Sequence, residues 1–186
     1  ISNLWEIFAI WKGGMSFHGW ALGVIGMLFY FSYRFRYRIF DISDILVSIL
    51  PIALWLGRIG NYINGELLWY YPYHGPLAIL KDWISYFPST LFQAFLEWIV
   101  LFSIMQAYRY IYGSKRKNTW FASGLFLLSY GILRLIAEKF RLPDQHIWYL
   151  LQTDWLTLGM IYSIPFILFG WYIIYLSRKS PQENSK

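Results

Sequence analysis

The chain of 186 residues contains no cysteine, and only 14% of its residues are charged. The absence of cysteine excludes disulfides, thiolate zinc sites and a cysteine nucleophile of the protein's own. Soluble domains carry about 25% charged residues, so the shortage of charge argues against a soluble globular enzyme. The aromatic share of 23% excludes intrinsic disorder as well. What is present is a hydrophobic share of 58%, which indicates an integral membrane protein.

Apolar segments close to the about 20 residues of a membrane-spanning helix recur along the chain. They cover residues 17–33, 44–63, 88–112, 120–137 and 155–177, and Pro51 interrupts the second. We therefore predict an all-α polytopic membrane protein with about five transmembrane helices. They form a single domain over residues 1–179, followed by a polar cytoplasmic tail at 180–186. Because the chain begins with Ile1 and no signal-peptide pattern precedes the first segment, we expect it to be the C-terminal portion of a longer protein.

Ten of the 16 lysine and arginine residues lie in three groups, over residues 34–38, 109–117 and 178–186. All three groups fall on the same side of an alternation of five spans. Basic residues are retained on the cytoplasmic side of membranes, so this side is predicted to be cytoplasmic. The connections 58–87 and 138–153 then lie on the outer face. Topology accounts for the net charge of +6, and we expect no nucleic-acid partner.

Ionisable side chains inside spanning segments are costly and mark functional sites by default. Three of the predicted helices place polar residues toward their outer ends: His18 in the first, Arg58 in the second, and Tyr130, Arg134 and Glu138 in the fourth. The last three are spaced i, i+4, i+8 and therefore share one helical face. Two guanidinium groups match the geometry of a phosphodiester, and a histidine can accept a proton from a nucleophile. These residues predict action on a phospholipid of the outer leaflet, but they do not identify the acceptor.

Each of these residues also has an interpretation without catalysis. Arg134 and Glu138 can be an ordinary i, i+4 ion pair, and Arg58 can be an interfacial arginine whose head group reaches water. A single histidine in a helix is most often structural. Gln93 and Glu97, one turn apart in the third segment, are expected to face the bundle interior as contacts between helices.

Three motifs carry a resemblance to a known family. Residues 57–66 read GRIGNYINGE, residues 13–19 read GGMSFHG, and Tyr130–Arg134 is followed by Glu138 and Arg141. In order and spacing they resemble the signature, histidine and arginine motifs of the prolipoprotein diacylglyceryl transferases, from about Trp11 to Gly170. Members of that family are seven-helix proteins of the bacterial inner membrane whose site faces the periplasm. The resemblance implies seven helices in the complete protein, two of them upstream of this chain.

The resemblance also implies an activity and its residues. The diacylglyceryl group of phosphatidylglycerol would pass to the lipobox cysteine thiol in a preprolipoprotein signal peptide, forming a thioether and releasing glycerol 1-phosphate. The catalytic residues implied are His18 as the base, Arg58 and Arg134 on the lipid phosphate, and Tyr130. The substrate-binding residues implied are Arg58, Asn61, Asn64, Glu66, Arg134 and Glu138. The partners are these two substrates and the bilayer, and the scheme needs neither a metal nor a cofactor.

The chain departs from the family pattern at several positions. Phe87, Phe92 and Gln93 belong to a run reading FPSTLFQ, where the family typically reads HPSQLYE. Trp20 follows Gly19 where a glycine is usual, and Met160 stands where a glutamine is usual. These changes favour one alternative, a divergent phospholipid-binding membrane protein without catalytic activity. A transporter is the weakest alternative, because the polar residues gather at one face and no inverted repeat is visible.

Overall fold

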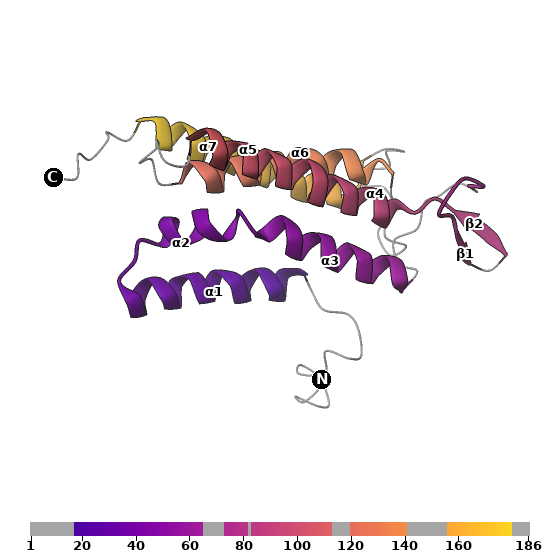
Figure 1. The fold of residues 1–186 in the computed structure, drawn as a ribbon, viewed down its shortest axis with the longest axis horizontal. Coiled ribbons are helices and arrows are strands. Elements are labelled where there is room, and N and C mark those ends of the chain that lie inside the picture. Colours follow the sequence, from indigo (N-terminus) through magenta and orange to yellow (C-terminus); the bar gives the residue numbers. More distant parts are fainter. Residues whose placement is uncertain (1–16, 65–72, 82, 113–119, 141–155, 180–186) are drawn as a thin grey trace, which may run out of the picture. The chain divides into compact units, whose positions relative to one another are not determined.

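The computed structural model describes residues 17–64, 73–81, 83–112, 120–140 and 156–179, without the side chains of 17–22, 81 and 158. The helical elements are α1 (Phe17–Phe35), α2 (Ile39–Leu46), α3 (Leu50–Ile63), α4 (Ser89–Phe95), the π-helical turn η3 (Leu96–Leu101), α5 (Phe102–Tyr112), α6 (Phe121–Glu138) and α7 (Leu158–Lys179) (Figure 1). An antiparallel hairpin of β1 (Ile79–Lys81) and β2 (Ile84–Tyr86) precedes α4 and pairs Ile79 with Tyr86. The chain divides into two compact units, Ile1–Ile42 and Ser43–Lys186, which are described separately.

The first unit contains α1, which confirms a helix at the first predicted apolar segment. Its large apolar side chains, such as Phe29 and Tyr33, are exposed, as the side chains of a lipid-facing helix are. The helix ends where Arg36 takes a left-handed backbone conformation with φ of 58°. The Ser32 hydroxyl donates to the carbonyl oxygen of Tyr37 at 2.8 Å across this end. Arg34 lies in the last turn, at the side predicted to be cytoplasmic.

Three helices of the second unit are long and apolar enough to cross a membrane: Ser89–Tyr112, Phe121–Glu138 and Gly159–Lys179. The first of these is continuous through α4, η3 and α5. A fourth span arises if α2 and α3, bent by 52°, form one broken span. The last three predicted segments are thus confirmed, with boundaries that differ by at most four residues.

The second and fifth predicted segments need corrections at their boundaries. The second begins at Ile39 rather than at residue 44, and its break precedes Pro51, which lies in the first turn of α3. Proline suits that place because the first turn needs no N–H from it. The fifth begins at Leu158 rather than at residue 155, since Thr157 accepts the backbone N–H of Met160 at 3.3 Å and so caps α7.

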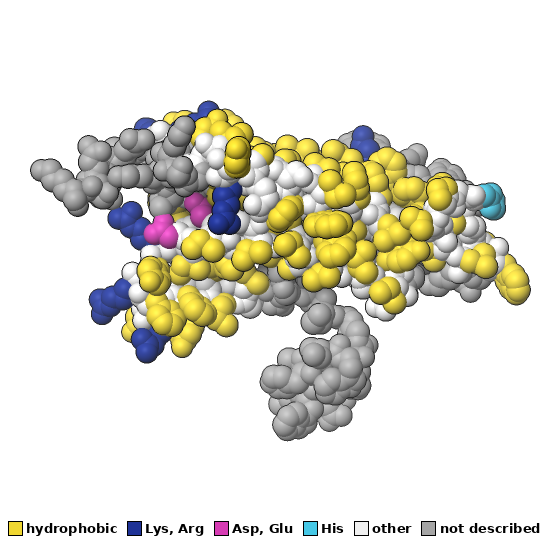
Figure 2. All heavy atoms as spheres, in the orientation of Figure 1, with side chains coloured by type: hydrophobic (Ala, Val, Ile, Leu, Met, Phe, Trp, Pro, Cys, Tyr) yellow, Lys and Arg dark blue, Asp and Glu magenta, His cyan; other side chains and the backbone are white. Residues whose placement is uncertain are grey.

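Helix α6 is the most enclosed of the three spans, with 61% of its apolar window buried against 22% for α7. Glycines allow these two helices to pack closely. A Cβ on Gly124 would lie 2.9 Å from the carbonyl oxygen of Gly170, and one on Gly131 would lie 3.2 Å from that of Ser163. Small residues serve this purpose in membranes, where backbones approach without a hydrophobic driving force. Figure 2 shows the apolar side chains that cover the helices of this unit and would face lipid.

Ring contacts fix the direction of the spans. The Tyr108 ring stacks on Phe121 with centroids 5.1 Å apart, and the Arg178 guanidinium lies 6.0 Å from the same ring. The C-terminal ends of α5 and α7 therefore meet the N-terminal end of α6, so α6 runs antiparallel to both. Arg109, Arg178 and Lys179 accordingly lie toward one end of the unit, as the predicted alternation requires. We call this end the basic end.

Asp44 caps α6 at the basic end. Trp120, the residue before α6, has φ of 89° and makes no side-chain cap. The Asp44 carboxylate instead accepts the backbone N–H groups of Trp120 and Ser123, both at 2.9 Å, and the Ser123 hydroxyl. A carboxylate at a helix N-terminus satisfies orphan donors and opposes the positive end of the helix dipole.

We expect Asp44→Ala to lower the free energy of unfolding by about 1–2 kcal/mol, because the start of α6 loses its cap. Thermal unfolding of the detergent-solubilised protein measures this change. Asp41→Ala serves as the matched control, since Asp41 lies in the first turn of α2 and takes no part in the α6 cap. Equal losses in the two variants would contradict the capping role.

Candidate functional site

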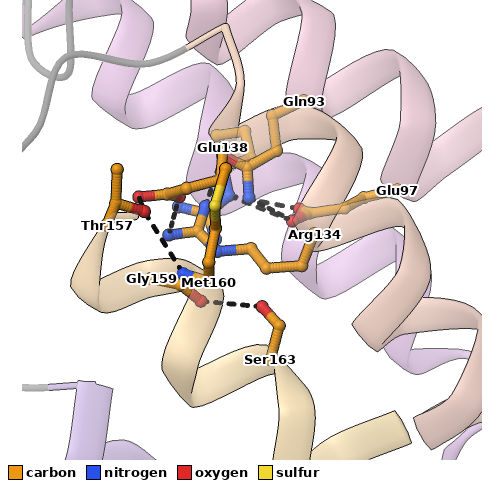
Figure 3. Close-up of polar contacts among 9 residues, drawn as sticks. Gln93, Glu97, Arg134, Glu138, Thr157, Gly159, Met160 and Ser163 are labelled. Atoms are coloured by element: carbon orange, nitrogen blue, oxygen red, sulfur yellow. Dashed lines mark hydrogen bonds and ion pairs between the residues drawn. The ribbon is translucent and has the colours of Figure 1, made fainter. Parts of the chain in front are cut away.

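A buried chain of polar side chains connects α3, the helix at 89–112 and α6 (Figure 3). Arg58 Nε donates to both carboxylate oxygens of Glu97, at 3.3 and 3.2 Å. Gln93 Nε2 donates to Glu97 Oε1 at 2.7 Å, and Arg134 Nη1 donates to Gln93 Oε1 at 3.0 Å. The two arginines, from helices far apart in sequence, are therefore joined through one glutamate and one glutamine.

The chain continues from α6 to the start of α7. Arg134 Nη2 pairs with Glu138 Oε2 at 3.0 Å, and the Thr157 hydroxyl donates to Glu138 Oε1 at 3.1 Å. Gly159 is required beside them, because a Cβ there would collide with the Glu138 carboxylate. We refer to the side chains that make these contacts as the polar chain. Its members are Arg58, Gln93, Glu97, Arg134, Glu138 and Thr157.

The polar chain lies toward the end of the unit opposite the basic end. Arg58 and Glu138 are near the C-terminal ends of α3 and α6, and Gln93 is near the N-terminal end of the helix at 89–112. Thr157 directly precedes α7. Since the basic end is defined by the start of α6 and the end of α7, the polar chain and the basic residues lie at opposite ends of the helices.

Burial differs between the acidic and basic members of the polar chain. The side chains of Glu97 and Glu138 are 3% and 5% exposed, whereas those of Arg58 and Arg134 are 17% and 14% exposed. The glutamates are therefore enclosed and orient the arginines, whose side chains are the more accessible members of the two pairs. Glu97 lies in the π-helical turn η3, a local departure from α-helix that is frequent at functional sites.

The two guanidinium groups are held in different ways. Arg58 contacts Glu97 through Nε, and its terminal nitrogens carry four further N–H groups. Tyr130 is buried on α6, close enough to Arg58, Arg134 and Glu97 to interact with them electrostatically. Arg134 donates to Gln93 through Nη1 and forms its ion pair with Glu138 through Nη2. A guanidinium group has five N–H donors in a planar fork, which suits the oxygens of a phosphate group.

The structure brings together four of the residues singled out in the sequence: Arg58, Tyr130, Arg134 and Glu138. The spacing i, i+4, i+8 correctly placed the last three on one face of α6, since Arg134 and Glu138 pair with each other and Tyr130 interacts electrostatically with Arg134. Among the described residues, no group of three or more His, Cys, Asp or Glu side chains is arranged to hold a metal ion.

The other predicted site residues are not part of the polar chain as described. His18 lies in the first turn of α1, in the first unit, and its side chain is outside the described residues. Glu66 is also outside them. Asn61 lies in α3 one turn beyond Arg58, and Asn64 ends that helix with its N–H bonded to the Gly60 carbonyl oxygen.

Phe87 and Phe92, which depart from the family motif, belong to an aromatic cluster near the polar chain. Phe92 lies 4.8 Å from Phe140 between ring centroids, and Phe87 lies 5.1 Å from Tyr73. Phe87 also contacts Phe92 and Phe140, at 6.3 and 6.2 Å. Aromatic pairs at these separations stabilise by about 0.5–1.5 kcal/mol each. Phe87 and Phe92 therefore have packing roles that join the hairpin, α4 and the end of α6.

The sequence analysis did not predict the full roles of two members of the polar chain, Gln93 and Thr157. It treated Gln93 as a contact between helices, which the bond from Arg134 of α6 confirms, but it did not foresee that Gln93 also bonds to Glu97, the partner of Arg58. It did not single out Thr157. The available signal was the position of a threonine three residues before Met160 at the start of an apolar run, a spacing typical of an N-cap. Met160 is 9% exposed and lies beside the same side chains (Figure 3).

Comparison with known proteins places this arrangement in a family. The family described as prolipoprotein diacylglyceryl transferase matches residues 1–176. The chain is 39% identical over 201 residues to the phosphatidylglycerol–prolipoprotein diacylglyceryl transferase of Blochmanniella floridana, covering 95% of this chain and 68% of that protein. It is 40% identical over 200 residues to the enzyme of the same name from Wigglesworthia glossinidia brevipalpis, covering 95% and 70%. The corresponding protein of Methylococcus capsulatus is 44% identical over 168 residues, which cover 88% of this chain and 62% of that protein. This helical membrane protein belongs to the prolipoprotein diacylglyceryl transferase family.

Proposed function

We propose that this chain is a transferase that moves the diacylglyceryl group of phosphatidylglycerol to the thiol of the lipobox cysteine in a preprolipoprotein signal peptide. A thioether forms and glycerol 1-phosphate is released, the first step of bacterial lipoprotein maturation. The relatives reported above carry the name of this activity. The observation that carries the proposal is the convergence of Arg58 and Arg134 on one buried Gln93–Glu97 pair.

The reaction needs stabilisation of charge on phosphate. The thiol loses its proton to a base, its sulfur attacks the glyceryl carbon that bears the phosphate oxygen, and the carbon–oxygen bond breaks. The electron pair of that bond goes to the phosphate oxygen, so a phosphodiester with one negative charge becomes a monoester with two. Groups that bind the second charge lower the barrier, because they act more strongly on the transition state than on the lipid. Arg58 and Arg134 are suited to this role.

The remaining site residues take roles consistent with their positions. Glu97 and Glu138 hold the two guanidinium groups from their buried sides, and Tyr130 lies beside both arginines. We propose His18 as the base for the substrate thiol, on the family motif alone. Asn61, Asn64 and Glu66 are proposed to contact the lipid head group, also on the motif. The scheme uses no metal or cofactor.

The proposal includes a location. The polar chain lies opposite the basic end, and basic ends of membrane proteins face the cytoplasm. The site is therefore proposed to face the periplasm from the bacterial inner membrane, with residues 1–179 as a single transmembrane domain and 180–186 as a cytoplasmic tail. Cysteine-accessibility labelling of single cysteines introduced at Arg109 and His74, which differ in predicted side, would test this orientation.

The activity is tested by reconstitution. The protein is incorporated into vesicles with phosphatidylglycerol labelled in its acyl chains and incubated with a lipobox peptide. We expect the label to appear on the peptide cysteine in a bond that resists reduction, as a thioether does. An otherwise identical peptide with serine in place of the cysteine is the control. Binding of phosphatidylglycerol without transfer, under conditions where an authentic family member works, would establish the non-catalytic lipid-binding alternative instead.

A further inference from the structure

Gln93 occupies the position between the two arginines of the site. Its side-chain amide donates to Glu97, which holds Arg58, and accepts from Arg134. We infer that Gln93 is a positioning residue that fixes the two guanidinium groups relative to each other for one phosphate group. This inference rests on the proposed function and deepens it. Gln93 departs from the family motif, and the inference gives this departure a specific role in this chain.

An amide suits this place for a chemical reason. One side of Gln93 meets a carboxylate, which can only accept a hydrogen bond, and the other meets a guanidinium, which can only donate. The amide nitrogen must therefore face Glu97 and the amide oxygen must face Arg134, as observed at 2.7 and 3.0 Å. The orientation of the amide is set by its two neighbours. An ionised glutamate would lack the donor, and a leucine would lack both groups.

Charge supports the same assignment. The charged groups facing Gln93 are Arg58 from α3, Glu97 from η3, and Arg134 with its partner Glu138 from α6. Their formal charges cancel, and the titratable hydroxyl of Tyr130 also interacts with the arginines. The neutral amide of Gln93 connects the two ion pairs without changing this balance of charge.

Burial separates this role from direct catalysis. Gln93 is 4% exposed, whereas both arginines are more accessible. The amide therefore acts on the lipid through the guanidinium groups that it orients. Small displacements of positioned groups reduce rates strongly, by about 100-fold for a misplacement near 1 Å. The expected signature is a loss of turnover in a protein that remains folded.

The test compares Gln93→Leu, Gln93→Glu and the control Gln106→Leu in the full chain. Gln106 lies on the same continuous helix, and its Nε2 donates to the Ser48 carbonyl oxygen at 3.3 Å, away from both arginines. Transfer to the lipobox peptide and binding of phosphatidylglycerol in micelles are measured well below the thermal midpoint of each protein. We expect Gln93→Leu to lower turnover by about 10- to 100-fold and Gln106→Leu to change it by less than about twofold.

Gln93→Glu provides a test that does not depend on packing, because it restores the glutamate that the family motif typically carries at this position. A carboxylate still accepts from Arg134, and a proton shared between two adjacent carboxylates is donated from one to the other. Gln93→Glu should therefore retain turnover close to that of the wild type, whereas Gln93→Leu, which has neither a donor nor an acceptor, should not.

The outcomes separate the two claims. A folded Gln93→Leu with wild-type turnover, or a folded Gln93→Glu that is as slow as Gln93→Leu, would overturn the positioning role while leaving the proposed function standing. A wild-type protein that neither binds phosphatidylglycerol nor transfers its diacylglyceryl group would overturn the proposed function and the positioning role together.

Discussion

Arg134→Ala should lower diacylglyceryl transfer by about 1,000-fold or more while the protein still inserts into the membrane. Arg134 lies on α6, the most enclosed span, and its guanidinium contacts both Gln93 and Glu138. Removing it takes away one of the two positive groups proposed to stabilise the phosphate. Arg134→Lys should retain part of the activity, at about 1–10% of wild type, since an ammonium keeps the charge but loses the planar fork.

Arg109→Ala is the matched control for these variants. Arg109 is an exposed arginine in the last turn of α5, at the basic end, so its removal changes the net charge equally without touching the site. The initial rate of label transfer from phosphatidylglycerol to the lipobox peptide is compared in the three variants. Arg134→Ala with the activity of Arg109→Ala would remove Arg134 from the mechanism.

Loss of folding can be separated from loss of chemistry at this position. Without Arg134, the buried carboxylate of Glu138 retains the hydroxyl of Thr157 as a hydrogen-bond donor but loses the ion pair with Arg134. The double variant Arg134→Ala/Glu138→Gln replaces that buried carboxylate with a neutral amide and should melt at a higher temperature than Arg134→Ala. Its transfer activity should remain absent. A double variant that recovers both stability and activity would show that Arg134 only neutralises Glu138.

Several features of this molecule could be predicted from residues alone, because they depend on local chemistry. The helical face shared by Tyr130, Arg134 and Glu138 follows from the helical period, and the three spans after residue 88 follow from apolar length. The sides on which the connections lie follow from the groups of basic residues between the spans. These are properties of one segment at a time, so a single sequence contains the information.

Other features depend on partners that are far away in sequence. Gln93 reads as an ordinary interior residue until the fold places Glu97 on one side of its amide and Arg134 on the other. The same holds for Asp44, which caps a helix that begins 77 residues later along the chain. Hydrogen bonds of this kind leave no periodic pattern or motif in the sequence. They are established only when the helices have packed.

The polar chain also shows how a membrane site tolerates four charged side chains. Each arginine has a buried glutamate, and each glutamate has a second donor, Gln93 for Glu97 and Thr157 for Glu138. An isolated charge at this depth would be costly, whereas paired and hydrogen-bonded charges are not. The neutral partners, Gln93 and Thr157, are thus as necessary to the arrangement as the ions. This arrangement leads to a second large expected effect, at the most buried ion.

Glu97→Leu should lower the free energy of unfolding by about 3–5 kcal/mol, because it leaves the Arg58 guanidinium without its buried counter-ion. The Glu97 side chain is 3% exposed, and it receives Arg58 Nε on both oxygens as well as the amide of Gln93. Glu97→Gln should cost less, since an amide oxygen still accepts one of these hydrogen bonds. Unfolding of the detergent-solubilised protein in a graded denaturing detergent gives the three stabilities.

The double variant Arg58→Leu/Glu97→Leu distinguishes the stabilising role of this pair from its chemical role. Removing both charges abolishes the unpaired ion, so the double variant should be more stable than Glu97→Leu alone, with a coupling energy of about 1–3 kcal/mol between the two sites. Its transfer activity should nevertheless be as low as that of Arg58→Leu, because the phosphate has lost one of its two guanidinium groups. Additive losses of stability would show that the 3.2 Å contact between Arg58 and Glu97 contributes nothing to the fold. Activity near the wild-type value in the double variant would show that Arg58 is needed only as the counter-ion of a buried glutamate.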